Sequence, residues 1–152
     1  MAIEKLDSFV KQILIYFKNK DYGEAHSLAT KMVAKFPKEM ISHFLLARAT
    51  FWLERYPEAI SEAIKAFNLA KGGDLLPCAI LLGSSYFQSG EYEKGYALLS
   101  KFEKEKNEEV KKLLFIFSLA RKNEKEAVSH VADLFQINRQ AAKKLVLKFL
   151  SS

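Results

Sequence analysis

The stretch from Leu81 to Leu99 reads LLGSSYFQSGEYEKGYALL and contains three glycines and three tyrosines. The glycines are Gly83, Gly90 and Gly95, and no strand pattern precedes them. A phosphate-binding loop needs closely spaced glycines after a strand, followed by Lys and then Ser or Thr. The spacing therefore excludes such a loop. The residues around Gly90 predict instead that this glycine ends a helix.

Tyrosines and small residues recur along the chain at a nearly fixed period. Tyr22 is followed by Tyr56 after 34 residues, and Tyr56 by Tyr92 after a further 36. A small residue stands three positions after each tyrosine, and the series of small residues continues at Ala127. Apolar residues recur at helical spacing, without the sustained alternation typical of strands. The pattern predicts four units of about 34 residues, each a pair of antiparallel helices.

The third unit resembles the tetratricopeptide repeat (TPR), whose signature combines Leu-Gly-x-x-Tyr, Gly-x-Tyr and a small residue followed by a large apolar one. The matching residues are Leu82, Gly83, Tyr86, Gly90, Tyr92, Gly95 and Leu99. Pro37 matches the proline that ends the first unit. The resemblance covers about residues 8–135 and weakens in the fourth unit, where Phe115 and Ser118 replace the usual small residue and aromatic. It implies stacked helix hairpins that bind other proteins.

The predicted fold is all-α: a superhelical array of about four antiparallel αα-hairpins and a C-terminal capping helix, forming a single domain over residues 1–152. We expect the repeats at residues 6–37, 40–71, 76–106 and 108–136, and the capping helix at residues 138–150. Stacked hairpins need such a cap because the last repeat otherwise exposes its core face. Asn138 is the expected N-cap of this last helix.

Local signals support the predicted helix starts. Asp21 is followed three residues later by Glu24, and Asn123 by Glu126, which is the spacing of a capping box. Pro57 is placed where the first turn of a helix tolerates proline. These positions predict tight turns between the two helices of a pair.

Composition points to a protein folded without metal or disulfide. The chain has 152 residues, 49% of them hydrophobic, and one cysteine, Cys78. A single cysteine fits a reducing compartment, and charges at Glu4, Lys5 and Asp7 are unlike a secretory signal. The longest apolar run near the C-terminus, LLFIF, is too short to span a bilayer. We therefore predict cytoplasmic residence, with the nucleus as the alternative.

The formal net charge of +6 is unevenly distributed. Residues 101–152 hold twelve Lys and Arg against seven Asp and Glu, and no acid follows Asp133. The basic patch near the C-terminus consists of Arg139, Lys143, Lys144 and Lys148. Such a patch is usually a solvated helix face, and it can also attract nucleic acid, acidic peptides or anionic lipid.

No set of residues has the spacing of a catalytic or metal site. His26, His43 and His130 are each isolated, so we expect no metal, with His26 and His130 at the surface or between helices. Cys78 follows Pro77 and precedes an apolar run, which favours a packing role over a nucleophile. Neither a triad nor a convincing pair of acids is found. The sequence predicts a protein that is not an enzyme and needs no cofactor.

The resemblance implies that the first helix of each pair lines a concave groove. The residues that match this lining are Val10, Leu14, Phe17, Phe44, Arg48, Phe51, Trp52, Ile80, Ser84, Phe87 and Gln88. Most of them are aromatic or aliphatic, so the groove suits an apolar or amphipathic segment. The alternative is that these side chains belong partly to the core. If they are exposed, Arg48 and Trp52 are the expected anchors.

The sequence also tests one known mode of binding in this family. Repeat proteins that grip the acidic tails of chaperones use Lys, Asn and Arg at five helix positions. The matching residues here are all apolar: Val10, Leu14, Leu45, Pro77 and Leu81. The chain therefore does not carry this carboxylate clamp.

The predicted function is a scaffold or adaptor that binds a peptide or helix of a partner protein through the apolar groove. Self-association is a variant of this hypothesis, since an apolar groove needs to be covered. The alternative function is nucleic-acid binding through the basic C-terminal third. Membrane binding by the last helix rests on Lys143, Lys144 and Lys148 and is the weakest of these hypotheses.

Overall fold

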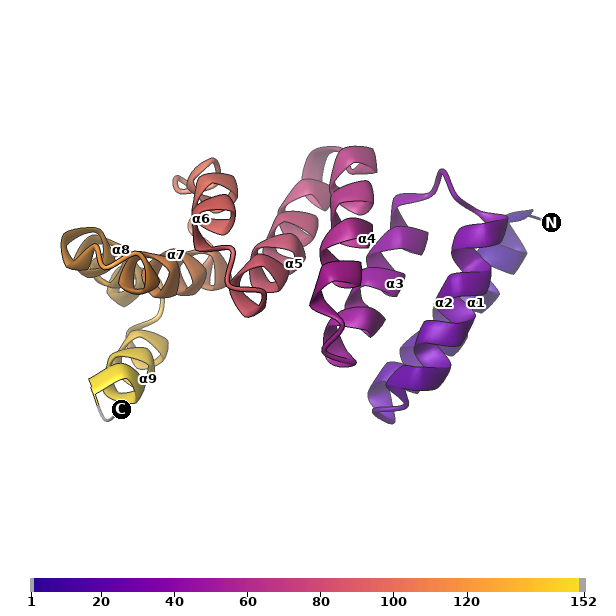
Figure 1. Ribbon diagram of the computed structural model, residues 1–152, viewed down its shortest axis with the longest axis horizontal. Coiled ribbons are helices and arrows are strands. Elements are labelled where there is room, and N and C mark those ends of the chain that lie inside the picture. Colours follow the sequence, from indigo (N-terminus) through magenta and orange to yellow (C-terminus); the bar gives the residue numbers. More distant parts are fainter. Residues whose placement is uncertain (1, 151–152) are drawn as a thin grey trace. The chain divides into compact units, whose positions relative to one another are not determined.

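A computed structural model describes residues 2–150 of the chain and the side chains of residues 5–149. Across these residues it contains α-helices, one short 3₁₀ turn and no strand, which confirms the all-α prediction (Figure 1). The helices are α1 (Ala2–Lys18), α2 (Tyr22–Lys35), α3 (Met40–Trp52), α4 (Tyr56–Leu69), α5 (Leu75–Gln88), α6 (Tyr92–Ser100), α7 (Glu108–Ala120), α8 (Glu124–Ile137) and α9 (Arg139–Leu150). The 3₁₀ turn, Gly72–Asp74, precedes α5.

The chain divides into two compact units, and the boundary lies inside α5. Unit 1 comprises Met1–Ser85 and unit 2 comprises Tyr86–Ser152. In unit 1, α1 packs on α2, α2 on α3 and α3 on α4, so that two helix hairpins lie in series. In unit 2, α6 packs on α7, α7 on α8, and α8 on α9. Each unit is thus built from helices that pack on their neighbours in the sequence.

The helix ends that precede α2, α4, α6 and α8 share one turn geometry. One residue in each turn adopts a left-handed conformation: Lys20 (φ 60°), Glu54 (φ 61°), Gly90 (φ 78°) and Lys122 (φ 59°). Its N–H donates to the carbonyl three residues back, and the following N–H donates to the carbonyl five residues back. The bond from Asp21 to Tyr16 is 2.8 Å long, and the bond from Arg55 to Thr50 is 3.0 Å long. These two bonds define a Schellman motif, which satisfies carbonyls that a helix end leaves open.

The residue after each left-handed position starts the next helix. Its carbonyl accepts a hydrogen bond from a buried small residue four positions on: Ala25, Ala59, Gly95 and Ala127 at 3.0–3.1 Å. These are the small residues of the sequence repeat. The repeat therefore marks a fixed sequence of helix end, turn and helix start.

Two of the expected side-chain caps are confirmed. The Oδ1 atom of Asn123 accepts from the N–H of Glu126 at 3.1 Å, and that of Asn138 accepts from Ala141 at 3.0 Å. The capping box expected at Asp21 is wrong, because the Asp21 side chain makes no cap hydrogen bond. Asp21 is exposed, so its carboxylate stays hydrated.

The core of unit 1 forms where α1, α2 and α3 meet. Its buried residues are Ile13, Ala25, Ala29, Met32, Leu45, Leu46 and Ala49. A second cluster of Ala66, Ala70 and Cys78 is covered by partly buried apolar side chains. Phe44 packs against both clusters, which places it in the core. The alanines allow close approach of the helices, while Ile13 and Met32 fill the space between them.

In unit 2, the close approach at Gly95 involves α7. A Cβ atom at Gly95 would meet the ring of Phe117, which is fully buried. The ring of Phe115, also buried, lies 5.5 Å from that of Phe149 on α9. The large side chain that departs from the repeat signature at Phe115 is thus covered by the last helix.

Replacing Gly90 with alanine tests the third turn. Gly90→Ala should lower the free energy of unfolding by about 1 kcal/mol, because a Cβ atom is strained at positive φ. Urea denaturation followed by circular dichroism measures the change. Gly23→Ala is the matched control: a Cβ there meets nothing within 4 Å, so the change should be neutral or stabilising. Equal effects of the two substitutions would contradict the turn assignment.

Replacing Gly95 tests the contact between α6 and α7. Gly95→Ala should destabilise the chain by about 1–3 kcal/mol, because the methyl group overlaps the Phe117 ring. Adding Phe117→Leu to this variant should cost less than Phe117→Leu costs alone, because the smaller side chain makes room for the methyl group. Strictly additive effects in the double-mutant cycle would show that the two residues do not compete for space.

Candidate functional site

Five aromatic side chains of unit 1 form a continuous chain of ring contacts, which we call the aromatic cluster. Its members are Phe17, Tyr22, Phe51, Trp52 and Tyr56. Trp52 stacks on Tyr22 with the ring centroids 5.5 Å apart and an interplanar angle of 12°. Phe51 meets Trp52 edge-on at 5.7 Å and Tyr56 at 5.6 Å. Such pairs stabilise one another by about 0.5–1.5 kcal/mol beyond the area that they bury.

The turns place these rings together. In each of the first two turns, a phenylalanine stands three residues before the left-handed position and a tyrosine two residues after it. Reversal of the chain at Lys20 brings the ring centroids of Phe17 and Tyr22 to 6.3 Å from each other, and reversal at Glu54 brings the Phe51 ring next to the Tyr56 ring. The aromatic cluster therefore follows from turn geometry and sequence spacing.

Part of the aromatic cluster and its surroundings is open to solvent. Trp52 is 48% exposed and Leu14 is 52% exposed. Arg48 is also exposed, and its guanidinium lies 5.9 Å from the centre of the Phe17 ring, within the range of a cation–π contact. An exposed cation thus lies against the aromatic cluster, and Leu14 stands one helical turn before Phe17, a member of that cluster.

The remaining predicted groove residues differ in exposure. Val10, Phe17, Phe44, Phe51, Ile80, Ser84 and Phe87 are half-buried, while Gln88 is exposed. The structure brings Phe17, Arg48, Phe51 and Trp52 together in unit 1. Phe87 and Gln88 belong to unit 2. The single groove through all eleven residues stays a prediction.

Unit 2 repeats the pair of rings without the tryptophan. Phe87 lies 5.4 Å from Tyr92 and 5.5 Å from Phe117. Gln88 occupies the sequence position that corresponds to Trp52, since both follow the paired phenylalanine. The exposed indole is therefore specific to the second repeat.

His43 is a structural residue that the sequence analysis left without a role. It is 5% exposed; its Nε2 atom donates to the carbonyl of Pro37 at 2.6 Å, and its Nδ1 atom lies 2.7 Å from a carboxylate oxygen of Glu62. The ring joins α3, α4 and the loop before α3. The sequence signal was present, because His43 precedes Leu46, Ala47 and Thr50 at the spacing of one helical face.

The chemistry of Cys78 supports a packing role. Burial, with a smaller effect of the Asp74 carboxylate, raises the pKa of the Cys78 thiol to about 11. A thiol with this pKa is protonated at neutral pH and is a poor nucleophile. Within residues 5–149, no group of three or more His, Cys, Asp or Glu side chains is arranged to hold a metal ion.

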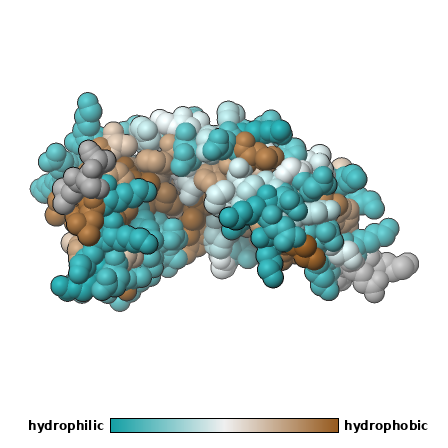
Figure 2. Space-filling view, turned by 90° about the horizontal axis from the view of Figure 1, so that it is seen from below, coloured by the Kyte–Doolittle hydropathy of each residue, from teal (hydrophilic) through white to brown (hydrophobic). Residues whose placement is uncertain are grey.

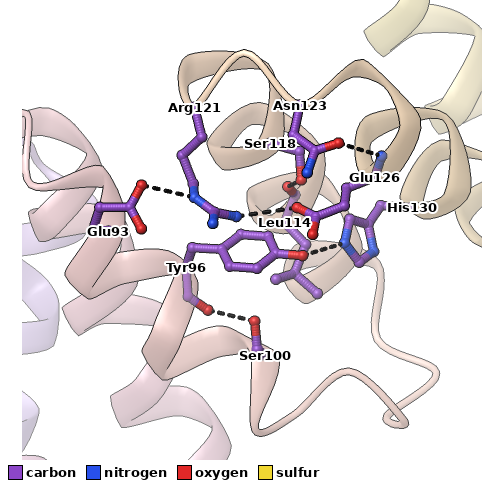
Figure 3. Close-up of polar contacts among 9 residues, drawn as sticks. All are labelled: Glu93, Tyr96, Ser100, Leu114, Ser118, Arg121, Asn123, Glu126 and His130. Atoms are coloured by element: carbon purple, nitrogen blue, oxygen red, sulfur yellow. Dashed lines mark hydrogen bonds and ion pairs between the residues drawn. The ribbon is translucent and has the colours of Figure 1, made fainter.

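A polar cluster in unit 2 connects α6, α7 and α8 (Figure 3). The Tyr96 hydroxyl lies 3.2 Å from Nε2 of His130, and the Arg121 guanidinium lies 4.1 Å from the centre of the Tyr96 ring. Arg121 also pairs with Glu93 at 2.9 Å and with Glu126 at 3.1 Å. Burial raises the pKa of Tyr96, and a hydrogen bond to Glu126 adds to the shift. The phenol therefore stays protonated at neutral pH.

His130 is buried between helices, at 2% exposure, and is not a surface residue. Burial lowers the pKa of His130, and the charge of Lys111 adds to this effect, while Glu103, Glu126 and Asp133 oppose it. Among the described residues, Nδ1 of His130 has no hydrogen-bond partner. An imidazolium carries two N–H donors, so protonation would leave one of them unsatisfied in the interior.

The side chain of Lys111, on α7, contacts both the loop after α6 and helix α8. It is 5% exposed, and its ammonium donates to the carbonyl of Glu103 and pairs with Asp133 at 3.1 Å. A buried lysine without such partners would be strongly destabilising. The partners account for a cation on an otherwise apolar helix face.

Comparison with solved structures identifies the fold. PilF of Pseudomonas aeruginosa has a TM-score of 0.81 and 18% identity, with 99% of this chain and 71% of that chain covered. The TPR protein TTC0263 of Thermus thermophilus has a TM-score of 0.76 and 18% identity, with 96% and 80% covered. The TPR2B domain of yeast Sti1, in a complex with pHsp70, has a TM-score of 0.60 and 18% identity, with 90% and 98% covered.

These likenesses show that the chain has the tetratricopeptide-repeat fold, as its sequence predicts. No protein-family profile and no curated protein sequence matches the chain. Among the described residues, no helix combines the length and the hydropathy needed to cross a bilayer.

The buried imidazole of His130 predicts a dependence of stability on pH. The unfolded chain binds a proton at the ordinary pKa of 6.5, whereas the folded chain binds it only at a lower pH. Stability should therefore fall as the pH drops below about 6.5, by about 1.4 kcal/mol for each unit by which the folded pKa is lowered. Urea denaturation near pH 5 and near pH 7.5 measures this loss.

His130→Gln should lose less stability than the wild type over the same pH range, because glutamine does not titrate. His26→Gln is the matched control, and it should keep the wild-type pH dependence. The assignment fails if His130→Gln and the wild type respond equally to acidification.

Proposed function

We propose that this chain is a protein-interaction scaffold without catalysis and that it binds an apolar or amphipathic helical segment of a partner protein. The aromatic cluster of unit 1 is the proposed binding surface. The observation that carries the proposal is Trp52, which is 48% exposed although its ring is already fixed by stacking on Tyr22. A rigid, half-exposed indole loses little conformational freedom when a partner covers it.

Two further exposed residues of unit 1 extend the proposed surface. Leu14 offers apolar area at 52% exposure, and Arg48 offers an exposed cation over the Phe17 ring. Tryptophan, tyrosine and arginine are the residue types that dominate binding energy at protein interfaces. An amphipathic helix would place apolar side chains on Trp52 and Leu14 and a polar one near Arg48.

The fold and the residue types support this choice of partner. The Sti1 TPR2B domain, which shares the fold, was solved in a complex with pHsp70. Positions that would form a carboxylate clamp are apolar here, among them Val10, Leu14 and Leu45. An apolar segment therefore fits this surface better than an acidic tail. The protonated, buried thiol of Cys78 supports a function without catalysis. Cytoplasmic residence is also part of the proposal.

Substitution of the indole tests the proposal. Trp52→Ala should weaken partner binding by about 2 kcal/mol, roughly thirtyfold in Kd, because the residue has the type and position of an interface anchor. Affinity purification with mass spectrometry identifies the partner, and titration of the purified pair measures Kd. Circular dichroism should show unchanged helicity, since Trp52 is half-exposed.

The matched control is Ile64→Ala, which removes another exposed apolar side chain of unit 1, at 37% exposure on α4. It should leave the partner affinity unchanged. Light scattering of the wild type and of Trp52→Ala asks whether the bound segment comes from a second copy of the chain. Equal affinity of Trp52→Ala and the wild type would refute the proposed surface.

A further inference from the structure

Helix α8 carries a second row of apolar residues beside its buried side. The buried side consists of Ala127, His130 and Leu134. Residues three and four positions apart lie on one side of a helix. By this spacing the second row, which we call the α8 stripe, consists of Val128, Val131, Ala132 and Phe135.

The α8 stripe is open to solvent although α8 packs on both α7 and α9. Val128 is 64% exposed, more than any other large apolar side chain among the described residues. Ala132 is also exposed, while Val131 and Phe135 are half-buried. Figure 2 shows hydrophobic surface among hydrophilic side chains at the end of the molecule where α8 and α9 lie. Burial of this apolar area against a partner is favourable.

The α8 stripe is flanked by opposite charges. Glu124 stands four residues before Val128, and Arg139 stands four residues after Phe135. Both charged residues are exposed, and among the described residues neither lies within ion-pair distance of an opposite charge. Arg139 is the first residue of α9 and is exposed like the other residues of the basic patch. The stripe therefore has an acidic end and a basic end.

The spacing of these residues is symmetric about the middle of the α8 stripe. Counting outward from its two central residues, an apolar residue follows after three positions on each side and a charged residue after seven. When two identical helices pack antiparallel about a two-fold axis, residues at equal distances from the axis face each other. Val128 of one copy then meets Phe135 of the other, and Glu124 meets Arg139. The symmetry repeats each of these contacts, so both ion pairs form together.

A parallel pairing of two α8 helices lacks this complementarity. It would place Glu124 beside Glu124 of the second copy and Arg139 beside Arg139, and like charges in contact repel. In the antiparallel pairing, the N-terminus of each α8 also lies beside the C-terminus of the other, so the two helix dipoles attract. The order of the charges thus selects the antiparallel arrangement.

We infer that the α8 stripe is the interface of a homodimer in which α8 of a second copy packs antiparallel against it. A two-fold interface uses the same residues on both copies and closes the assembly at two chains. The inference is independent of the proposed function, because the aromatic cluster belongs to unit 1 and the α8 stripe to unit 2.

The dimer should be weak. Each copy contributes about three turns of one helix, which is less surface than a stable complex buries. We expect a Kd of about 1–100 µM. Sedimentation equilibrium of the full chain, over concentrations on both sides of this range, measures the Kd.

Substitution of the most exposed residue tests the interface. Val128→Glu should raise the Kd at least about tenfold, because the dimer would bury a carboxylate without a partner. The matched control is Ile15→Glu, which adds the same charge at an apolar residue of unit 1 that is 51% exposed. Its Kd should stay within about twofold of the wild type, since a distant charge is screened by salt. If Val128→Glu loses helicity, Val128→Ser serves instead and should still weaken association.

Exchange of the two charges tests the antiparallel order. Glu124→Arg and Arg139→Glu should each raise the Kd at least about threefold at low salt, because each brings like charges into contact. With both substitutions in one chain, opposite charges meet again and the wild-type Kd should return. A mixture of the two single variants should also associate, since opposite charges then meet at both ends of the stripe.

Several outcomes would overturn the inference. A wild type that stays monomeric at the highest concentration would leave the α8 stripe to another protein or to a membrane surface. Equal loss in Val128→Glu and Ile15→Glu would show repulsion by net charge alone. Single charge variants that associate as tightly as the wild type would exclude the antiparallel pairing. A dimer that is lost in Trp52→Ala and kept in Val128→Glu would place self-association at the aromatic cluster instead.

Discussion

The structure depends on one backbone constraint: a helix must end and reverse within three residues without leaving buried carbonyl groups unsatisfied. The left-handed residue of each Schellman turn achieves this by directing two N–H groups back at the helix that has just ended. Lysine, glutamate and glycine all occupy this position, so the two hydrogen bonds outweigh the steric cost of a Cβ atom, about 1 kcal/mol. The turn thereby fixes which residues of the two helices face each other.

The position of the turn explains why small residues recur along the sequence. Ala25, Ala59, Gly95 and Ala127 stand at the same distance after their turns, and all are buried. At this position a larger side chain would separate the packed helices, and Gly95 shows the extreme case, because the Phe117 ring occupies the space of its missing side chain. The small residues thus recur at a fixed spacing because the helices pack closely at the same position after each turn.

Most of the fold could be predicted because its signals are local. Turn, tyrosine and small residue lie within a few positions of one another, so their spacing reports the hairpin directly. The cap at Asn123 was predicted for the same reason. The predicted cap at Asp21 was wrong because the Asp21 carboxylate is exposed to solvent and does not accept from a backbone N–H, and residue spacing does not distinguish these two outcomes. The burial of His43 was missed, although this residue lies one turn from buried residues of its own helix. For His130 the sequence left two positions open, the surface and the space between helices, and the structure shows the second.

The site was predictable in part. Arg48, Phe51 and Trp52 lie on one face of α3 by spacing, Phe17 lies on the corresponding face of α1, and the structure brings the four together. Tyr22 and Tyr56 were read only as markers of the repeat, because their contact with these rings crosses the turn. Partners of Lys111 come from another helix and from a loop, and a sequence pattern of one helix holds no information about them.

Only the second repeat has a tryptophan two residues before the left-handed position of its turn, whereas the turn itself is found four times in the described residues. The corresponding positions are Lys18 in the first repeat, Gln88 in the third and Ala120 in the fourth. A segment bound along truly identical repeats would have several equivalent alignments, each displaced by one repeat from the next. Trp52 is the one indole among the four positions, so the alignments are not equivalent. A segment that covers Trp52 has one preferred alignment along the repeats, and this alignment also fixes the direction in which the segment runs.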